Sequence, residues 1–186
     1  MHSLTLHTGP HGQYYIAEER VAYGDTRPTV YLDTTIPSFL AGRSRKDLLS
    51  TRRQRITRVW WDRYRARYDL RVSYRVVTEA SAGDPKYADQ RVRLLNGIES
   101  LESDHRTEAL MFLLVGRGLL PLKASADAEH IAIAAIHSVN YLLSWNCRHL
   151  ANPHIAGRIV RTCERFGFQC PQICTPEQLM RTCSHA

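Results

Sequence analysis

Short apolar runs alternate along the chain with longer segments in which apolar residues recur at helical spacing. Residues 29–33 (TVYLD) form a β-rich run that ends in a carboxylate, and residues 141–145 (YLLSW) form a continuous apolar run typical of a buried strand. Further strands are predicted over 70–74 and 99–102 and around Ile173. Each of these runs is short enough for a strand and is followed by a segment of different period.

The intervening segments predict helices. In 125–137, the clearest of them, Ile131, Ile133, Ala134 and Ala135 form a buried side. The other predicted helices are 47–68, one that begins at Val76, 85–95, 107–117, 153–166 and 176–180. In 47–68 the apolar positions are Leu48, Leu49, Ile56, Val59, Trp60 and Tyr64. Alternation of strands with helices predicts an α/β sandwich around a mainly parallel sheet.

The chain length predicts one domain, which we place at 29–182. Residues 1–28 are rich in His, Gly and Tyr without a clear period and are interpreted as an N-terminal extension of uncertain order, in which 14–17 could form an edge strand. No apolar run approaches the roughly 20 residues of a membrane-spanning helix. The start lacks the pattern of a secretory signal, and five cysteines in no framework spacing argue against a secreted disulfide fold. We therefore expect a cytoplasmic protein without a membrane partner.

Positive charge is concentrated in one part of the chain. The formal net charge is +7, yet the stretch 43–75 alone holds twelve basic and three acidic residues. A segment this basic suits a polyanion such as nucleic acid, although a solvated helix face is the plain structural alternative.

Three acids occupy equivalent places in the predicted fold. Asp33 ends a strand, Glu79 is placed in the first turn of the helix after a strand, and Asp127 is placed in the first turn of 125–137. In open α/β sheets these positions share one crevice, where clustered carboxylates need a cation. Mg²⁺ or Mn²⁺ fits such oxygen ligands and can activate water for attack on a phosphodiester. Taken singly, Asp33 could be a turn residue, Asp127 a residue favoured by the helix dipole, and Glu79 simply an exposed side chain.

The three acids lie in stretches that resemble the PIN domain, and within it the VapC-like ribonuclease toxins of bacterial toxin–antitoxin pairs. The stretches are VYLDTTIPSFL, SYRVVTEASAGDP, ADAEHIAIAAIHSVNYLLSWNCRHLAN and PQICTPEQLM, and the likeness covers about 29–180. The resemblance implies a Rossmann-like three-layer α/β/α sandwich. It also implies that Asp33, Glu79 and Asp127 bind Mg²⁺ or Mn²⁺ to cleave RNA, with a cognate antitoxin and a homodimer as partners.

Several further residues take roles by the same resemblance. Many PIN domains carry a fourth acid where this chain has Asn146, which is expected to ligate or position water without adding charge. Thr35 matches a hydroxyl position that often supports the site. His130, three residues after Asp127, could touch the site, although a packed or surface histidine is the alternative. The basic helix would hold RNA phosphates. The candidate residues in the basic stretch 43–75 are Arg43, Arg45, Arg52 and Arg53.

The sequence thus predicts a metal-dependent endoribonuclease in which Asp33, Glu79, Asp127 and Asn146 are catalytic. Two alternatives stay open: an RNA-binding module of the same fold that has lost activity, and an interaction protein whose basic helix docks an acidic partner.

Overall fold

The protein is described by a computed structural model of its 186 residues. The structure describes residues 3–8, 14–19, 27–42, 47–146, 150 and 153–182. Five parallel strands form its main sheet, in the spatial order β5-β4-β3-β6-β7. The strands are β3 (Thr29–Leu32), β4 (Asp69–Ser73), β5 (Glu99–Leu101), β6 (Tyr141–Leu143) and β7 (Gln172–Cys174).

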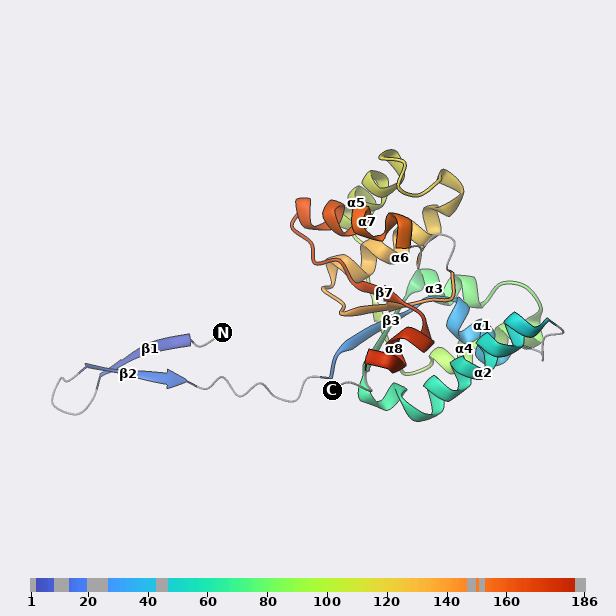
Figure 1. The fold of residues 1–186 in the computed structure, drawn as a ribbon, viewed down its shortest axis with the longest axis horizontal. Helices are drawn as coiled ribbons and strands as arrows, with labels where there is room; N and C mark the ends of the chain where they lie inside the picture. The colour runs from blue at the N-terminus through green and yellow to red at the C-terminus, as the bar shows by residue number, and fades with distance from the viewer. Residues whose placement is uncertain are drawn as a thin grey trace.

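Helices cover both faces of this sheet (Figure 1). The helices α5, α6 and α7 lie on one side, whereas α1, α2, α4 and α8 lie on the other. The helices are α1 (Thr35–Ala41), α2 (Leu48–Arg63), α3 (Tyr74–Ala80), α4 (Pro85–Leu95), α5 (His105–Gly116), α6 (Ser125–Ile136), α7 (Pro153–Arg165) and α8 (Pro176–Thr182), with 3₁₀ turns at Arg65–Arg67 and Leu122–Ala124. The predicted three-layer, Rossmann-like α/β/α sandwich is confirmed.

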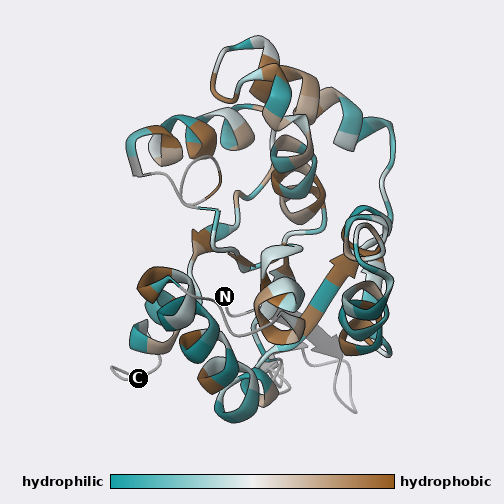
Figure 2. Cartoon of the chain, turned by 90° about the vertical axis from the view of Figure 1, so that its right-hand side faces the viewer, coloured by the Kyte–Doolittle hydropathy of each residue, from teal (hydrophilic) through white to brown (hydrophobic). Residues whose placement is uncertain are grey.

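The central strand β3 is buried on both faces, as is typical of parallel sheets. Val30, Tyr31 and Leu32 are all 0% exposed. Apolar residues of α6 cover this strand from one side, and Ile131, Ile133, Ala134 and Ala135 are buried there as predicted. Figure 2 shows hydrophobic strand segments in the interior, between helices that carry hydrophilic residues on their other faces.

The predicted helix 47–68 is shorter than expected, and its first turn is not buried. α2 ends at Arg63, and a 3₁₀ turn leads from it into β4. Leu48 and Leu49, which were assigned to the apolar face, are 89% and 58% exposed. The buried side is instead made by Gln54, Thr57, Trp60 and Trp61. The polar side chain of Gln54 can be buried because its amide donates to the backbone oxygens of Phe39 and Gly42, at 3.1 and 2.7 Å. These two hydrogen bonds join α2 to the end of α1.

The boundary between β4 and α3 also differs from the prediction, and this moves Glu79. The strand ends at Ser73, whose hydroxyl accepts a hydrogen bond from the backbone of Val76 and caps a helix that begins at Tyr74. Glu79 therefore lies in the second turn of α3, and the prediction of a first-turn position was wrong. Asp33 directly after β3 and Asp127 in the first turn of α6 lie where they were predicted.

The N-terminal part contains a separate antiparallel hairpin, β1 (Ser3–Thr8) and β2 (Tyr14–Glu19). The strand expected at 14–17 is thus present, and its partner is β1 rather than the main sheet.

Candidate active site at the carboxyl edge of the sheet

The chain reverses its direction across the sheet between β3 and β6. From β3 it proceeds outward through β4 to β5, returns to pair β6 on the other side of β3, and ends at β7. Ligand sites of open α/β sheets lie outside the carboxyl ends of the strands at this kind of switch point. Asp33 follows β3, and Ser144 and Asn146 follow β6, so these residues border the switch point directly.

Asp33 is held by hydroxyl and backbone donors in a nearly closed environment. Asp33 is only 4% exposed to solvent. Thr35 donates to Asp33 Oδ1 through its backbone N–H, at 2.9 Å, and through its hydroxyl. Ser144 Oγ donates to Oδ2 at 2.6 Å. Burial raises the pKa of the Asp33 carboxyl, although His130, Ser144 and Thr35 act in the opposite direction.

Among the described residues, no ion pair compensates the charge of the buried Asp33 carboxylate. Within the described part of the chain, no Lys, Arg or His nitrogen lies within 4 Å of the Asp33 carboxylate. A buried carboxylate without an ion-pair partner within 4 Å is costly to ionise, and a bound cation is one way to stabilise its charge.

Glu79 is half-buried and gathers three donors. Arg75 Nε donates to Oε1 at 2.9 Å, and Thr34 Oγ1 donates to Oε2 at 2.5 Å. His130 Nε2 lies 3.3 Å from the same Oε2. Burial raises the pKa of Glu79, but hydrogen bonds from His130 and Thr34, the charge of His130 and the contact with Arg75 together lower it to about 2. Glu79 is therefore held as a carboxylate.

His130 is a packed residue that also contacts the site. It is 3% exposed, and its Nδ1 lies 2.9 Å from the hydroxyl of Tyr31, which in turn lies 2.7 Å from Ser73 Oγ. Burial raises the pKa of Tyr31, so its hydroxyl keeps its proton. The chain Ser73–Tyr31–His130–Glu79 links the end of β4, the centre of β3, α6 and α3, and it fixes the orientation of the imidazole.

Asp127 and Asn146 contact one another. Asn146 Nδ2 donates to Asp127 Oδ1 at 2.9 Å, and the backbone N–H of Asn146 donates to Ser144 Oγ at 2.8 Å. Because Ser144 also binds Asp33, a path of hydrogen bonds runs from Asp33 through Ser144 and Asn146 to Asp127. We call Asp33, Glu79 and Asp127 the acidic edge.

The acidic edge has the donor chemistry of a hard cation site. Carboxylate and amide oxygens are the ligands that Mg²⁺ and Mn²⁺ prefer. Across the described residues, however, no group of three or more His, Cys, Asp or Glu side chains converges closely enough to hold a metal ion by itself. Ser144 and Asn146 link Asp33 to Asp127 by hydrogen bonds, whereas Glu79 is held separately by Thr34, Arg75 and His130.

Arg75 contacts two acidic side chains at or beside the acidic edge. Its guanidinium lies 2.9 Å from Glu79 and 3.6 Å from Glu129, and so forms ion pairs with both carboxylates. Glu129 lies two residues after Asp127 in α6 and is half-buried, with a side chain 24% exposed.

Sequence reasoning missed Arg75, Glu129, Thr34, Ser144 and Tyr31. Ser144 was treated as part of a buried strand, but β6 ends one residue before it. Arg75 and Glu79 are four residues apart, and that spacing is the one signal for their pairing that the sequence contains.

Two of the four arginines predicted to bind nucleic acid have structural contacts. Arg52 pairs with Glu177 of α8 at 2.9 Å, and the guanidinium of Arg53 lies 5.4 Å from the ring centre of Trp145. Trp145 is itself fixed by Nε1 donating to Thr57 Oγ1 at 2.7 Å, while its backbone N–H donates to Thr35 Oγ1. Arg43 and Arg45 lie outside the described residues.

Comparisons with protein-family models and with curated proteins find no match to this chain. Among the helices that the structure describes, none combines the length and the apolar character needed to cross a bilayer.

Proposed function

We propose that this protein is a metal-dependent endoribonuclease of PIN type, acting in the cytoplasm as the toxin of a toxin–antitoxin pair. The observation that carries the proposal is the position of Asp33. Its carboxylate is buried at the switch point between β3 and β6, oriented by Thr35 and Ser144, and without a cationic side chain in contact across the described residues. A hard divalent cation is the partner that this carboxylate lacks.

The residues around Asp33 take separate roles in this proposal. Asp33, Glu79 and Asp127 hold the ion, and Asn146 orients Asp127 through its amide. Thr35 and Ser144 fix both oxygens of Asp33. His130 holds Glu79 in place from the apolar side of α6. When bound, the ion would activate a water molecule for in-line attack and stabilise the leaving oxygen of a phosphodiester.

Arg75 acts as a competitor of the ion. Its guanidinium occupies Glu79 and Glu129 in the described arrangement, so binding of a divalent cation requires Glu79 to be released or shared. Glu129 is the acid closest in sequence to Asp127. With Arg75 displaced, its carboxylate adds negative charge to the edge, which offsets the neutral Asn146.

The partners follow from the same proposal. RNA is the substrate, a cognate antitoxin is the inhibitor, and a homodimer is the expected assembly. The exposed Leu48 and Leu49 at the start of α2 offer an apolar contact for such a protein partner.

Incubation of the purified protein with mixed RNA tests the nuclease. We expect cleavage in Mg²⁺ or Mn²⁺, none in EDTA, and none by Asp127→Asn. Asp62→Asn serves as the matched control, because Asp62 is an exposed acid on α2. Cleavage that survives Asp127→Asn contradicts the metal site. Salt-sensitive RNA binding without cleavage in any metal supports the non-catalytic RNA-binding module instead.

A further inference from the structure

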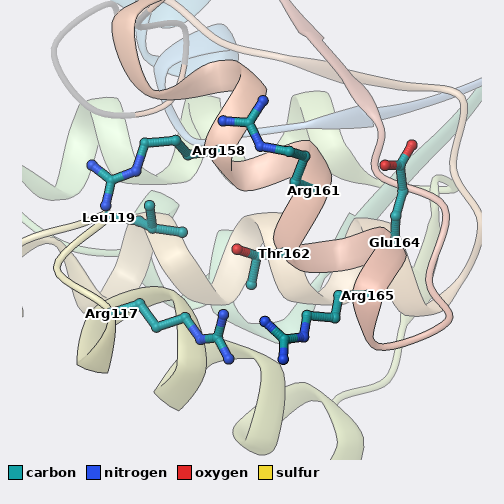
Figure 3. Close-up of a pocket in the computed structure, with 7 residues that line it drawn as sticks. All are labelled: Arg117, Leu119, Arg158, Arg161, Thr162, Glu164 and Arg165. Atoms are coloured by element: carbon teal, nitrogen blue, oxygen red, sulfur yellow. The ribbon is translucent and has the colours of Figure 1, made fainter.

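A second charged surface lies away from the acidic edge, between the end of α5 and the outer face of α7. It surrounds a pocket of about 680 Å³. The pocket is lined by Arg117, Leu119, Arg158, Arg161, Thr162, Glu164 and Arg165 (Figure 3). We call it the arginine pocket.

Three of the four arginines come from one stripe of α7. Arg158, Arg161 and Arg165 follow one another at intervals of three and four residues, which places them on one side of the helix. All three are exposed, whereas Ile159 and Cys163 are 0% exposed and anchor the opposite side in the core. At about 1.5 Å per residue, the stripe is roughly 10 Å long.

Arg117 completes the surface from another element. It is the residue after α5, and its guanidinium lies 5.6 Å from the ring centre of Phe166, which orients the side chain. Figure 3 shows the guanidinium groups of Arg117 and Arg165 pointing toward one another, while the carboxylate of Glu164 points away from both.

Among the described residues, the four arginines of this pocket outnumber its one acid, Glu164. Over the described residues, no carboxylate forms an ion pair with any of its four arginines. The contrast with other parts of the molecule is clear, since Arg52, Arg71 and Arg75 all pair with acids. Guanidinium groups that converge without an acid repel one another and favour a bound anion.

The geometry suits phosphate groups in a row. A guanidinium presents a planar fork that matches a phosphate, and a stripe of roughly 10 Å can meet more than one phosphate of the same strand. The hydroxyl-bearing Thr162, 6% exposed, lies between the arginines in the wall of the pocket.

The direction of α7 connects this surface to the acidic edge. α7 joins the parallel neighbours β6 and β7, so it starts at the carboxyl edge of the sheet and runs back along one layer. Arg158 is thus the arginine of the stripe closest to the acidic edge, and Arg165 is the most distant. A strand cut at the edge could continue along α7.

We propose that the arginine pocket binds the phosphate backbone of single-stranded RNA where the strand continues beyond the acidic edge. This inference rests on the proposed function, because RNA is taken as the polyanion that the protein meets. It names a substrate contact on α7 that the charge pattern of 43–75 did not indicate.

Binding of a labelled single-stranded RNA, measured by fluorescence anisotropy in EDTA at several salt concentrations, tests the pocket. The test variant is Arg158→Gln/Arg165→Gln. The control is Lys86→Gln/Arg93→Gln, which removes two exposed charges from α4 on the other side of the sheet. We expect the test variant to bind at least about tenfold more weakly and its log–log salt slope to fall by about 1.4, at about 0.7 per lost phosphate contact. The control should stay within about twofold.

Two outcomes overturn the proposal. Equal losses in both variants mean that only net charge matters, and unchanged binding by the test variant means that RNA does not use the pocket. A poly-glutamate peptide of matched charge is the competitor, and competition equal to that of RNA would indicate an acidic protein partner instead. Thermal unfolding of each variant checks the fold, and the single substitution Arg158→Gln replaces the pair if the pair unfolds.

The failure of this inference is distinct from that of the proposed function. The binding assay contains no metal and needs no cleavage, so it can succeed for a protein that never cuts RNA. Conversely, cleavage that depends on Asp127 with unaltered binding by the arginine variant leaves the nuclease proposal standing and removes only the role of α7.

Discussion

Asp33 at the acidic edge is 4% exposed and accepts hydrogen bonds from Thr35 and Ser144, whereas Arg158 and Arg165 in the arginine pocket are exposed and pair with no acid among the described residues. At the edge, neighbouring side chains satisfy and orient each carboxylate. In the arginine pocket, an external anion has to supply the partner of the guanidinium groups. The edge is thus part of the folded structure and a candidate for chemistry, while the pocket contributes little to the fold and is a candidate for affinity.

The largest difference should appear in the cleavage rate. Glu79→Gln keeps the size of the side chain but removes its charge, and loss of one electrostatic contact to a reacting centre costs about 10² to 10³ in rate. We expect RNA cleavage at saturating RNA to fall at least about 100-fold, measured in a single-turnover assay. Asp89→Asn on exposed α4 is the control. A near wild-type rate for Glu79→Gln would remove Glu79 from the metal site.

The next difference between the acidic edge and the arginine pocket should appear in the free energy of unfolding. Ser144→Ala removes the buried donor to Asp33 and the acceptor of the backbone N–H of half-buried Asn146. We expect a loss of about 1–3 kcal/mol in the free energy of unfolding in urea, because buried polar groups are left without partners. Arg165→Ala on the exposed pocket should change it by no more than about 0.5 kcal/mol. Similar losses of unfolding free energy in Ser144→Ala and Arg165→Ala would mean that the arginine pocket contributes as much to the fold as the acidic edge.

A smaller effect is expected from the competitor Arg75. Arg75→Gln frees Glu79 and Glu129 from the guanidinium, so Mn²⁺ should bind more tightly. An ion pair this exposed is worth about 0.2–1 kcal/mol, which corresponds to about a one-and-a-half- to fivefold gain in affinity. Isothermal titration calorimetry gives the value, with Arg93→Gln, which breaks a surface pair on α4, as the control. Weaker Mn²⁺ binding by Arg75→Gln would mean that Arg75 supports the site.

The last expected effect concerns the stability of the protein in acid. The pKa of Glu79 is about 2 in the folded protein, below its ordinary value of 4.5. Because the folded pKa is depressed, ionised Glu79 stabilises the fold above about pH 4.5, and this contribution is lost as the pH falls toward 2. The difference in unfolding free energy between wild type and Glu79→Gln should therefore shrink over this window in urea titrations. A difference that does not change with pH would mean that Glu79 has the same pKa folded and unfolded.

The sequence predicted the fold because the decisive signals are local. Continuous apolar runs mark β3 and β6, and their alternation with helical periods specifies a parallel sheet. The same signals place Asp33 and Asp127 at one edge. Glu79 was placed one turn too early in its helix because the cap by Ser73, one residue before the expected strand end, is a short-range hydrogen bond that the periodicity does not reveal.

Contacts between distant segments could not be predicted. Arg75 bridging α3 to Glu129 of α6, and Ser144 joining Asp33 to Asn146, depend on how the elements pack. The arginine pocket was missed for a related reason. Its basic residues come from α7 and from the turn after α5, so they form no dense run in the sequence. The arginines of α2 do form such a run, but Arg52 and Arg53 contact Glu177 and Trp145.

Under the proposed function, Asp33, Glu79 and Asp127 hold one hard divalent cation. Titration of the protein with Mn²⁺, followed by the loss of the free-ion signal in electron paramagnetic resonance, tests it most directly. We expect one Mn²⁺ per chain for wild type and for Asp62→Asn, at least about tenfold weaker binding for Asp33→Asn, and displacement by Mg²⁺. Equal Mn²⁺ binding by wild type and Asp33→Asn, with the Asp33→Asn protein shown to be folded, would contradict the account.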